Sequence, residues 1–556
     1  MRWHLMKILL SVLSLLSLLF YSSPFFARAS EQTPKKVIFM VMDGTNSDVI
    51  TLSRWFKGHP LALDSILVGG VQTYSLRSGI TDSAAAATAM ATSKKTVEDM
   101  IGMIPYMDRE IGSIARPTST ILEAAKQKGM ATGIVATSPI QHATPAAFSA
   151  HSNSRNDYDD IAEQQVYQDM DVVLGGGKMA LLPKSTNPSS LPQHLSGIGS
   201  TLPLYRKDGE NLIQILKKKG YQYIETKKQL NSVSSSKIWG TFATEDIAYE
   251  FDRKRLAPQQ PSLAQMTKKA INVLSKDPNG FFLFIEGSKI DWAAHKNDPV
   301  GMISEVLSFD SAVKAALDFA KRDQNTLLIA VTDHGNSGLT MGNTNTNHSY
   351  YKMPVSKFID PLKKAKFTLA GSISRLKKDQ SNLKKIAQDY GLNPLSKQDY
   401  KRLKTAKNLE DEMANQLAKR ANLGFTTKGH TGEDVFLYAY GPNKPTGLIN
   451  NTEIPKIIAS FLQVESFQKL NKLLFVDAAE YYEQKGYLTK IDRSNKENPV
   501  FIAKKNNETI KYPANKNIKV FNENVVELDG ITICNGNKFW ISILEKQKGA
   551  GPTPSS

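Results

Sequence analysis

KKVIFMVMDGTNSD, residues 35–48, is an apolar run that ends abruptly at an Asp-Gly pair. Such a run indicates a buried β-strand followed by a turn. The same form recurs in GFFLFIEGSKIDWAAH (280–295) and in NTLLIAVTDHGNSG (325–338), and each of these strands also ends in acidic residues or histidine. The three strands therefore predict both the kind of sheet and the place where its chemistry lies.

Amphipathic helical windows lie between these strands, among them 119–130 and 303–322. The alternation of strands and helices predicts an α/β fold, a three-layer α/β/α sandwich with a large, mostly parallel central sheet covered on both faces. Sites on such sheets form beyond the carboxyl ends of the strands. Five candidate site residues fall there: Asp43, Glu286, Asp291, Asp333 and His334.

TDSAAAATAMATS, residues 81–93, opens with an Asp-Ser pair ahead of a run of alanines. Asp and Ser are favoured helix caps and Ala is the best helix former, so the stretch by itself favours a capped helix. A Ser at a helix N-terminus also lies in a positive field, among free N–H groups that suit an anionic substrate such as phosphate. On this window alone a cap is the simpler interpretation and a nucleophile the alternative.

Histidine and aspartate recur at the spacing of metal ligands. Asp291 and His295 are four residues apart, so a helix would place both on one face as a chelating pair. Asp333 and His334 are adjacent at a strand end, and His430 lies in the turn-like KGHTGED. Together with the aspartate that ends the first strand, they predict a di-metal site of nitrogen and oxygen ligands, the kind that Zn²⁺ prefers. A single histidine is weak evidence for a metal site, because four other histidines have sequence surroundings that do not distinguish them from the candidate ligands: His59, His151, His194 and His348.

Seven motifs in order resemble the alkaline phosphatase family, from about residue 36 to 464. They are MDGTNSD, TDSAAAATA, ATSPIQHATPAAFSAHSNSR, DVVLGGG, IEGSKIDWAAH, TDHG and GHTGED. The resemblance implies a metal-dependent enzyme that hydrolyses phosphate monoesters at alkaline pH through a phosphoserine intermediate and releases inorganic phosphate. It also implies a homodimer.

The same resemblance implies a role for each site residue. Ser83 would be the nucleophile, and Asp82 would orient Arg155, whose planar fork suits two phosphate oxygens. The first zinc would be held by Asp291, His295 and His430. The second would be held by Asp43, Asp333 and His334. A magnesium site would use Asp43, Thr144 and Glu286. We expect a two-step reaction in which a metal-bound serine oxygen attacks phosphorus and a zinc-bound hydroxide then hydrolyses the phosphoserine.

Two positions depart from the best-known bacterial members, which have Asp where this chain has His142 and Lys where it has Trp292. Imidazole is a poorer partner for Mg²⁺ than a carboxylate, and Trp292 removes a cation near the phosphate. The pair therefore predicts looser magnesium binding, altered product release and a more alkaline optimum.

Two other functions compete with a phosphomonoesterase: another hydrolase of the same metal superfamily, either a sulfatase or a phosphodiesterase, and a secreted binding or envelope protein. A sulfatase usually has its nucleophile in a C-x-P-x-R context, which Cys534 in ITICNGN lacks, and a diesterase must accommodate a second ester group where Arg155 is expected to reach two free oxygens. A secreted binding or envelope protein would use the C-terminal region as its working part, but the complete ligand set argues against a dead enzyme. The monoesterase is favoured on motif agreement.

The chain has 556 residues, and its net charge of +17 becomes +14 without residues 1–29. Residues 352–428 carry 18 Lys and Arg against 7 Asp and Glu and predict a basic helical insertion. No base-reading or stacking motif accompanies this charge, so a solvated insertion is favoured over nucleic-acid binding.

The two ends of the chain predict processing and an accessory part. Residues 1–29 combine Arg2 and Lys7, an apolar run too short to span a bilayer and an Ala-Arg-Ala site, and predict a signal peptide and export to the periplasm or medium. Residues 30–464 form the predicted catalytic domain. Short alternating runs in 465–556 predict a small β-rich domain with a disordered tail, which could contact the envelope. The lone Cys534 allows no intrachain disulfide and is read as an inert packed residue.

Overall fold

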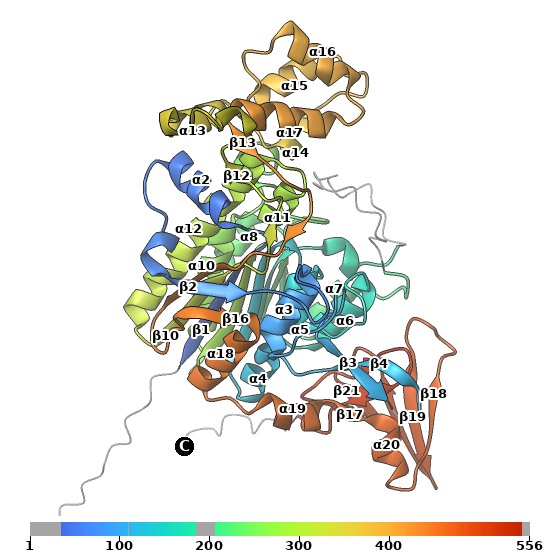
Figure 1. Ribbon diagram of the computed structural model, residues 1–556. Helices are drawn as coiled ribbons and strands as arrows, with labels where there is room; N and C mark the ends of the chain where they lie inside the picture. The colour runs from blue at the N-terminus through green and yellow to red at the C-terminus, as the bar shows by residue number, and fades with distance from the viewer. Residues whose placement is uncertain (1–34, 109, 185–205, 547–556) are drawn as a thin grey trace, which may run out of the picture. The chain divides into compact units, whose positions relative to one another are not determined.

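The computed structural model describes residues 35–108, 110–184 and 206–546. The predicted leader, the GAGPTPSS tail and His194 lie outside these residues. A ten-stranded sheet forms the centre of the described chain (Figure 1). In spatial order its strands are β16 (Gly447–Asn450), β2 (Leu67–Gln72), β15 (Val435–Tyr440), β10 (Thr326–Val331), β1 (Lys36–Met42), β9 (Phe281–Gly287), β5 (Ala131–Pro139), β6 (Val172–Gly176), β8 (Ile238–Thr241) and β7 (Gln222–Ile224). In this sheet β15 runs against both its neighbours and the other strands share one direction, so the predicted, mostly parallel sheet is confirmed.

Strand β1 shows why the fold has three layers. Its side chains alternate between two separate cores because successive residues of a strand point to opposite faces. The core on one face takes Ile38, Met40 and Met42. The core on the other face takes Val37, Phe39 and Val41. All seven residues of β1 are buried, which is the reason for the continuous apolar run in the sequence.

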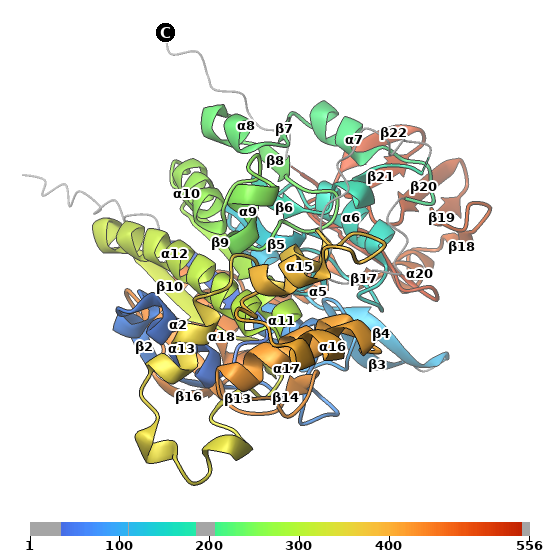
Figure 2. The ribbon, with the colours of Figure 1, turned by 90° about the horizontal axis from the view of Figure 1, so that it is seen from above.

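Helices cover both faces of the sheet (Figures 1 and 2). The first face is covered by α2 (Ser47–Lys57), α10 (Leu263–Leu274) and α12 (Pro299–Asp323). The second face is covered by α3 (Ser83–Thr92), α4 (Ile121–Gln127), α5 (Ala143–Ser149), α6 (Tyr158–Tyr167), α7 (Leu212–Lys218) and α18 (Ile454–Leu462). The α/β/α sandwich predicted from the sequence is therefore the observed architecture.

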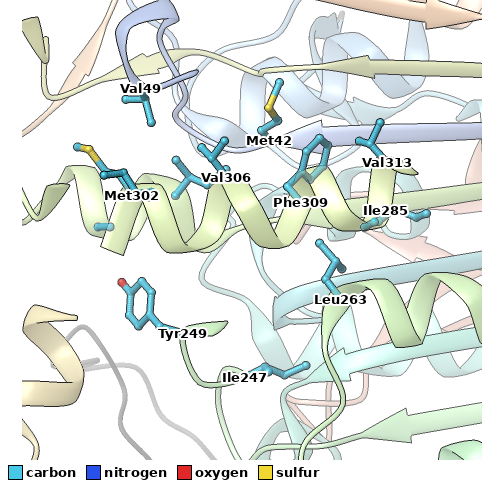
Figure 3. Packing of buried hydrophobic residues seen from close by; sticks show 14 of the residues in the cluster. Met42, Val49, Ile247, Tyr249, Leu263, Ile285, Met302, Val306, Phe309 and Val313 are labelled. Carbon is cyan, nitrogen blue, oxygen red and sulfur yellow. The ribbon is translucent and has the colours of Figure 1, made fainter. Parts of the chain in front are cut away.

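Helix α12 runs along the first face of the sheet, with Phe309 near the carboxyl end of β9 at Gly287 and Phe319 near its amino end at Phe281. Met302, Val306, Phe309 and Val313 recur at spacings of four, three and four residues and form one apolar stripe toward the sheet (Figure 3). An added Cβ at Gly287, the last residue of β9, would lie 2.8 Å from the Phe309 ring. The missing side chain therefore lets the helix approach closely behind the carboxyl end of β9.

The basic insertion is helical, as predicted. Its helices are α13 (Ser356–Leu362), α14 (Leu369–Ile373), α15 (Leu383–Asp389), α16 (Lys397–Thr405) and α17 (Leu409–Arg420). The two ends of the insertion meet where β11 (Gly335–Asn336) pairs antiparallel with β14 (His430–Thr431). This short ladder brings His430 to the strand-end residues that follow β10, although 95 residues separate it from Gly335.

The C-terminal region is β-rich, as predicted. Two helices, α19 (Phe467–Leu474) and α20 (Ala478–Glu483), precede its sheets. A five-stranded antiparallel sheet contains β18 (Leu488–Asp492), β19 (Val500–Lys505), β20 (Glu508–Pro513), β21 (Ile518–Phe521) and β22 (Asn524–Glu527). A three-stranded sheet contains β17 (Val476–Asp477), β24 (Phe539–Ile541) and β23 (Ile533–Cys534). Leu470, Ile531 and Trp540 enter the core beneath the second face of the large sheet, so this region packs on the body; the domain boundary at 464 stays a prediction.

Within the described ranges, none of the helices is both long and apolar enough to cross a membrane.

Candidate active site

Ser83 is the first residue of α3, and the cap is its neighbour Asp82. Asp82 Oδ1 accepts a hydrogen bond from the Ala85 N–H at 2.9 Å, which leaves the Ser83 hydroxyl free of the capping role. Ser83 Oγ lies 3.1 Å from His334 Nε2, and the residue is 2% exposed. The two interpretations of the Asp-Ser pair therefore divide between two residues: Asp82 caps the helix, and Ser83 faces the strand-end cluster.

Arg155 lies on the other side of Asp82. Its Nη1 donates to Asp82 Oδ2 at 3.2 Å, and its Nη2 lies 3.3 Å from His142 Nε2. Its backbone N–H donates to the Asp99 carbonyl at 2.8 Å, and the Asp99 N–H in turn donates to Asp82 Oδ2 at 3.1 Å. The guanidinium is thus held from two directions and remains partly exposed, with 21% of its side-chain surface accessible.

The first ligand cluster joins Asp291, His295 and His430. Helix α11 (Lys289–Ala294) places Asp291 and His295 one turn apart, with His295 Nε2 3.3 Å from Asp291 Oδ2. Each ring is oriented through its Nδ1, which lies 2.6 Å from the Lys428 carbonyl in His295 and 2.8 Å from the Thr81 carbonyl in His430. Their Nε2 atoms face each other at 3.3 Å, an arrangement that suits a cation between them because each ring keeps its proton on Nδ1.

The second cluster joins Asp43, Asp291 and His334, and it shares Asp291 with the first. Asp333, which was expected here, is also at hand, with Oδ2 3.3 Å from His334 Nε2. Both carboxylate oxygens of Asp43 and Oδ2 of Asp333 are buried and have no hydrogen-bond partner among the described residues. Burial and then the charges of neighbouring carboxylates raise the pKa of Asp43 well above its ordinary value. Such a carboxylate needs a proton or a cation, so these residues fit a metal.

The third cluster joins Asp43, His142 and Glu286. Within the part of the chain that the structure describes, Glu286 Oε1 and His142 Nδ1 are buried without hydrogen-bond partners, and so is the hydroxyl of Thr144 in the first turn of α5. Burial raises the pKa of Glu286 to about 7. Burial and then the Arg155 charge lower the pKa of His142 to about 3, so its ring is neutral at physiological pH. This cluster too offers unsatisfied ligand atoms, with one imidazole among the oxygens.

A family model described as "Alkaline phosphatase" matches residues 34–464. The chain belongs to the alkaline phosphatase family. Alkaline phosphatase 3 of Bacillus subtilis (strain 168) is 36% identical over 455 residues, covering 78% of this chain and 90% of that protein. The repressible alkaline phosphatase of Saccharomyces cerevisiae is 32% identical over 505 residues, covering 82% and 86%. As members of this family do, the protein hydrolyses phosphate monoesters and depends on metal ions.

Solved alkaline phosphatases share the fold. The cold-active enzyme from the psychrophile Shewanella sp. superposes with a TM-score of 0.64 at 30% identity, covering 77% of this chain and 99% of that one. The Thermus thermophilus enzyme superposes with a TM-score of 0.67 at 26% identity, covering 80% and 96%.

Two supporting residues of this alkaline phosphatase were missed by the sequence analysis. Asn336 Nδ2 donates to Asp291 Oδ1 at 2.6 Å and so holds the shared carboxylate. Gly44 has φ +63, and a Cβ there would lie 2.4 Å from Asp291 Oδ1, so only glycine leaves that carboxylate in place. Gly44 lies in the motif MDGTNSD and Asn336 in the quoted stretch 325–338, but only the contact with Asp291 reveals what they do.

The other described histidines lie outside the clusters. His151 is buried, with Nε2 3.0 Å from Glu123 Oε1 and Nδ1 2.8 Å from the Gly102 carbonyl, so both ring nitrogens have protein partners. His59 and His348 are exposed. What distinguishes the candidate histidine ligands is that each lies in a group of at least three acidic or histidine side chains, whereas within the described residues these other histidines do not.

Proposed function

We propose that this alkaline phosphatase works through a phosphoserine formed on Ser83. The observation that carries the assignment is the position of the Ser83 hydroxyl, buried at a helix N-terminus and 3.1 Å from a histidine of the second cluster. The free N–H groups of the first turn of α3 and the positive end of its dipole favour the phosphate dianion at this position. The hydroxyl is therefore placed for attack on a phosphorus atom bound at the same helix end.

Arg155 is the phosphate clamp of the proposal, and Asp82 positions it. A guanidinium fork binds two phosphate oxygens in a bidentate manner. A monoester has three non-bridging oxygens, so one is left for the metal ions when Arg155 binds two, whereas a diester has only two in all. Asp82 serves two purposes, because one oxygen caps α3 and the other holds the guanidinium. The nucleophile and the clamp are thereby held in one fixed relation, which is what in-line transfer requires.

For the metals we propose two Zn²⁺ and one Mg²⁺. The zinc ligands are Asp291, His295 and His430 for one ion and Asp43, Asp333 and His334 for the other. Asp43, Thr144 and Glu286 would hold Mg²⁺, with His142 nearby. When bound, these ions would neutralise developing charge and lower the pKa of a water molecule. A histidine-to-aspartate variant of the TAB5 alkaline phosphatase has been solved with Mg bound in its M3 site, at a TM-score of 0.54 and 26% identity. That result supports a carboxylate as the better magnesium ligand and a loose magnesium site in this chain.

We further propose a homodimer that is exported to the periplasm or medium. A yellow segment between β12 (Thr340–Met341) and α13 projects from the body (Figure 2) and carries Tyr350 and Tyr351, which are 72% and 70% exposed. Large exposed aromatic side chains of this kind suit a subunit interface. The export proposal rests on the leader pattern in residues 1–29, and a contact of the C-terminal region with envelope polymers remains a proposal.

The test is the phosphoenzyme itself. The zinc- and magnesium-loaded protein is mixed with an aryl phosphate, and the reaction is quenched in acid. The protein is then digested, and the mass of the peptide that contains Ser83 is measured by mass spectrometry. We expect added phosphate on that peptide and a fall in turnover of about a thousandfold or more in Ser83→Ala. Ser65→Ala, an exposed serine of the same protein, is the control and should keep full activity. Full activity of Ser83→Ala with unchanged metal content would contradict the assignment.

A further inference from the structure

A cavity of about 330 Å³ lies beside the segment that carries Arg155 and contains none of the metal ligands. Five separate parts of the chain line it. They are Arg77, the loop at 97–100, the hairpin of β3 (Met103–Asp108) and β4 (Gly112–Pro117), Asn153, and the turn at 535–537 between β23 and β24. This turn lies beyond residues 34–464, the part that the family model matches. The cavity is therefore built jointly by the family body and the C-terminal region.

The cavity walls are continuous with the groups that hold the phosphate clamp. Val97 and Met100 line it, and between them Asp99 bonds to both Asp82 and Arg155 through its backbone. A molecule in the cavity would therefore lie on the far side of one loop from the Asp82–Arg155 pair.

The turn at 535–537, which the C-terminal region contributes to the cavity, is hydrogen-bonded to the segment that carries Arg155. Asn153, two residues before Arg155, donates from Nδ2 to the Asn535 carbonyl at 3.0 Å. Asn535 Nδ2 donates to the Ala115 carbonyl of β4 at 2.6 Å, and Asn535 is 8% exposed. These two bonds connect the turn at 535–537 both to the hairpin and to the segment that carries Arg155.

The chemistry of the lining suits a polar anion. Arg77, Ser113, Asn153 and Asn537 supply a guanidinium, a hydroxyl and two amides, and no lining residue is acidic. Arg77 is exposed and makes no ion pair with any of residues 35–108, 110–184 and 206–546. A guanidinium without a carboxylate partner, beside amide and hydroxyl donors, is the donor set that recognises carboxylates and phosphates.

We propose that this cavity is the leaving-group subsite, and that it favours phosphate monoesters whose leaving group carries a second anionic group at a distance from the phosphate. The inference rests on the proposed function, because it places the scissile phosphate on Arg155. The phosphate binds at the clamp, the leaving group extends past the 97–100 loop, and its distal carboxylate or phosphate pairs with Arg77. Residues 535–537 give the C-terminal region a part in substrate selection.

The test compares two series of alkyl phosphates, one with a terminal carboxylate and one with a terminal hydroxyl, over chain lengths from two to eight carbons. For each length the ratio of kcat/KM for the two substrates is measured with the metal-loaded enzyme. The comparison uses wild type, Arg77→Met, Asn537→Ala and the control Arg322→Met, an exposed arginine at the end of α12. Because both arginine variants remove one positive charge, they separate a local contact from the general attraction of a basic protein for anions.

We expect the ratio in the wild type to rise by about two- to fivefold over a limited window of chain lengths, the size of a partly exposed ion pair. Arg77→Met should abolish this rise through KM and leave the hydroxyl series unchanged, Asn537→Ala should reduce it, and Arg322→Met should keep it. The inference would be overturned if the wild-type ratio of kcat/KM did not change with chain length, or if Arg77→Met and Arg322→Met lowered it equally. Hydrolysis of both substrate series would in either case still support the proposed function. Absence of hydrolysis in both series would instead refute the proposed function, and the inference with it.

Discussion

Lys289 offers a sharp test of how α11 is held in place. The side chain is 0% exposed, and its Nζ donates to Asp246 Oδ2 at 2.5 Å and to the Ile247 carbonyl at 2.7 Å. It also lies 3.8 Å from the centre of the Tyr249 ring. Replacing Lys289 with Met leaves the Asp246 carboxylate, 3% exposed, buried without its cation. Breaking a buried ion pair from one side costs about 3–5 kcal/mol, so Lys289→Met should lower the free energy of unfolding by about that amount.

The assay is denaturant unfolding of the metal-loaded protein, arranged as a double-mutant cycle. Lys289→Met, Asp246→Leu and the double variant are compared, and the double variant should be less destabilised than the sum of the singles by about 2 kcal/mol or more. The control is Lys314→Met on α12, whose exposed i,i+4 pair with Asp318 contributes only about 0.3–0.5 kcal/mol. If Lys289→Met were no more destabilising than Lys314→Met, or if the two single effects simply added, the burial argument would be wrong.

Further predictions concern the site and its surroundings. Gly44→Ala should reduce the amount of bound metal measured by elemental analysis, because the added Cβ would displace Asp291 Oδ1. The control is Gly58→Ala, which has a similar positive φ but open space around it and should change only the thermal stability. His142→Asp should tighten Mg²⁺ in a titration followed by activity, because a carboxylate is the harder ligand; unchanged affinity would count against the third cluster as its site. Burial raises the pKa of Glu305 to about 7, so its folded form binds a proton that the unfolded chain releases above about 4.5, and stability should fall as pH rises between these values. Glu305→Gln should flatten that fall when the unfolding midpoint is followed from pH 4.5 to 7.

Much of the fold was predictable from the sequence because strand and helix patterns are local. The strand at 36–42 is buried on both faces of the sheet, so almost all its residues are apolar. The strands at 281–287 and 326–331 are buried in the same way and show the same apolar runs. Helical periodicity identified α12 in the same way. Strand β15 was not predictable, because its reversed direction depends on which edge of the sheet the chain returns to after the long insertion.

The sequence predicted which acidic and histidine residues are candidate ligands, and the structure brings them together, but no sequence pattern indicated that Asp291 belongs to two of the clusters. Spacing alone relates Asp291 to His295, since one helical turn joins them. The approach of Asp291 to His334 and Asp43 depends on the contact between three strand ends, and no local pattern records it. The resemblance to the family placed Asp333 in the second metal site, beside His334. In the structure Asp333 lies near His334, and Asp291 lies close to the same histidine. Support from Asn336 and Gly44 became visible only through their contacts with Asp291.

The charge of the site explains why three clusters occur together. Four carboxylates are buried within it, and they carry about four negative charges when ionised: Asp43, Glu286, Asp291 and Asp333. Two divalent cations would neutralise these charges, and the site would then have no net attraction for a phosphate dianion. A third divalent cation and the Arg155 guanidinium would add positive charge, offset in part by Asp82, and the sum would favour the dianion. If the third ion is loosely held because of His142, the affinity for phosphate should rise with Mg²⁺ concentration. Product inhibition by inorganic phosphate should therefore strengthen on adding Mg²⁺, and inhibition that is independent of Mg²⁺ would show that two cations suffice.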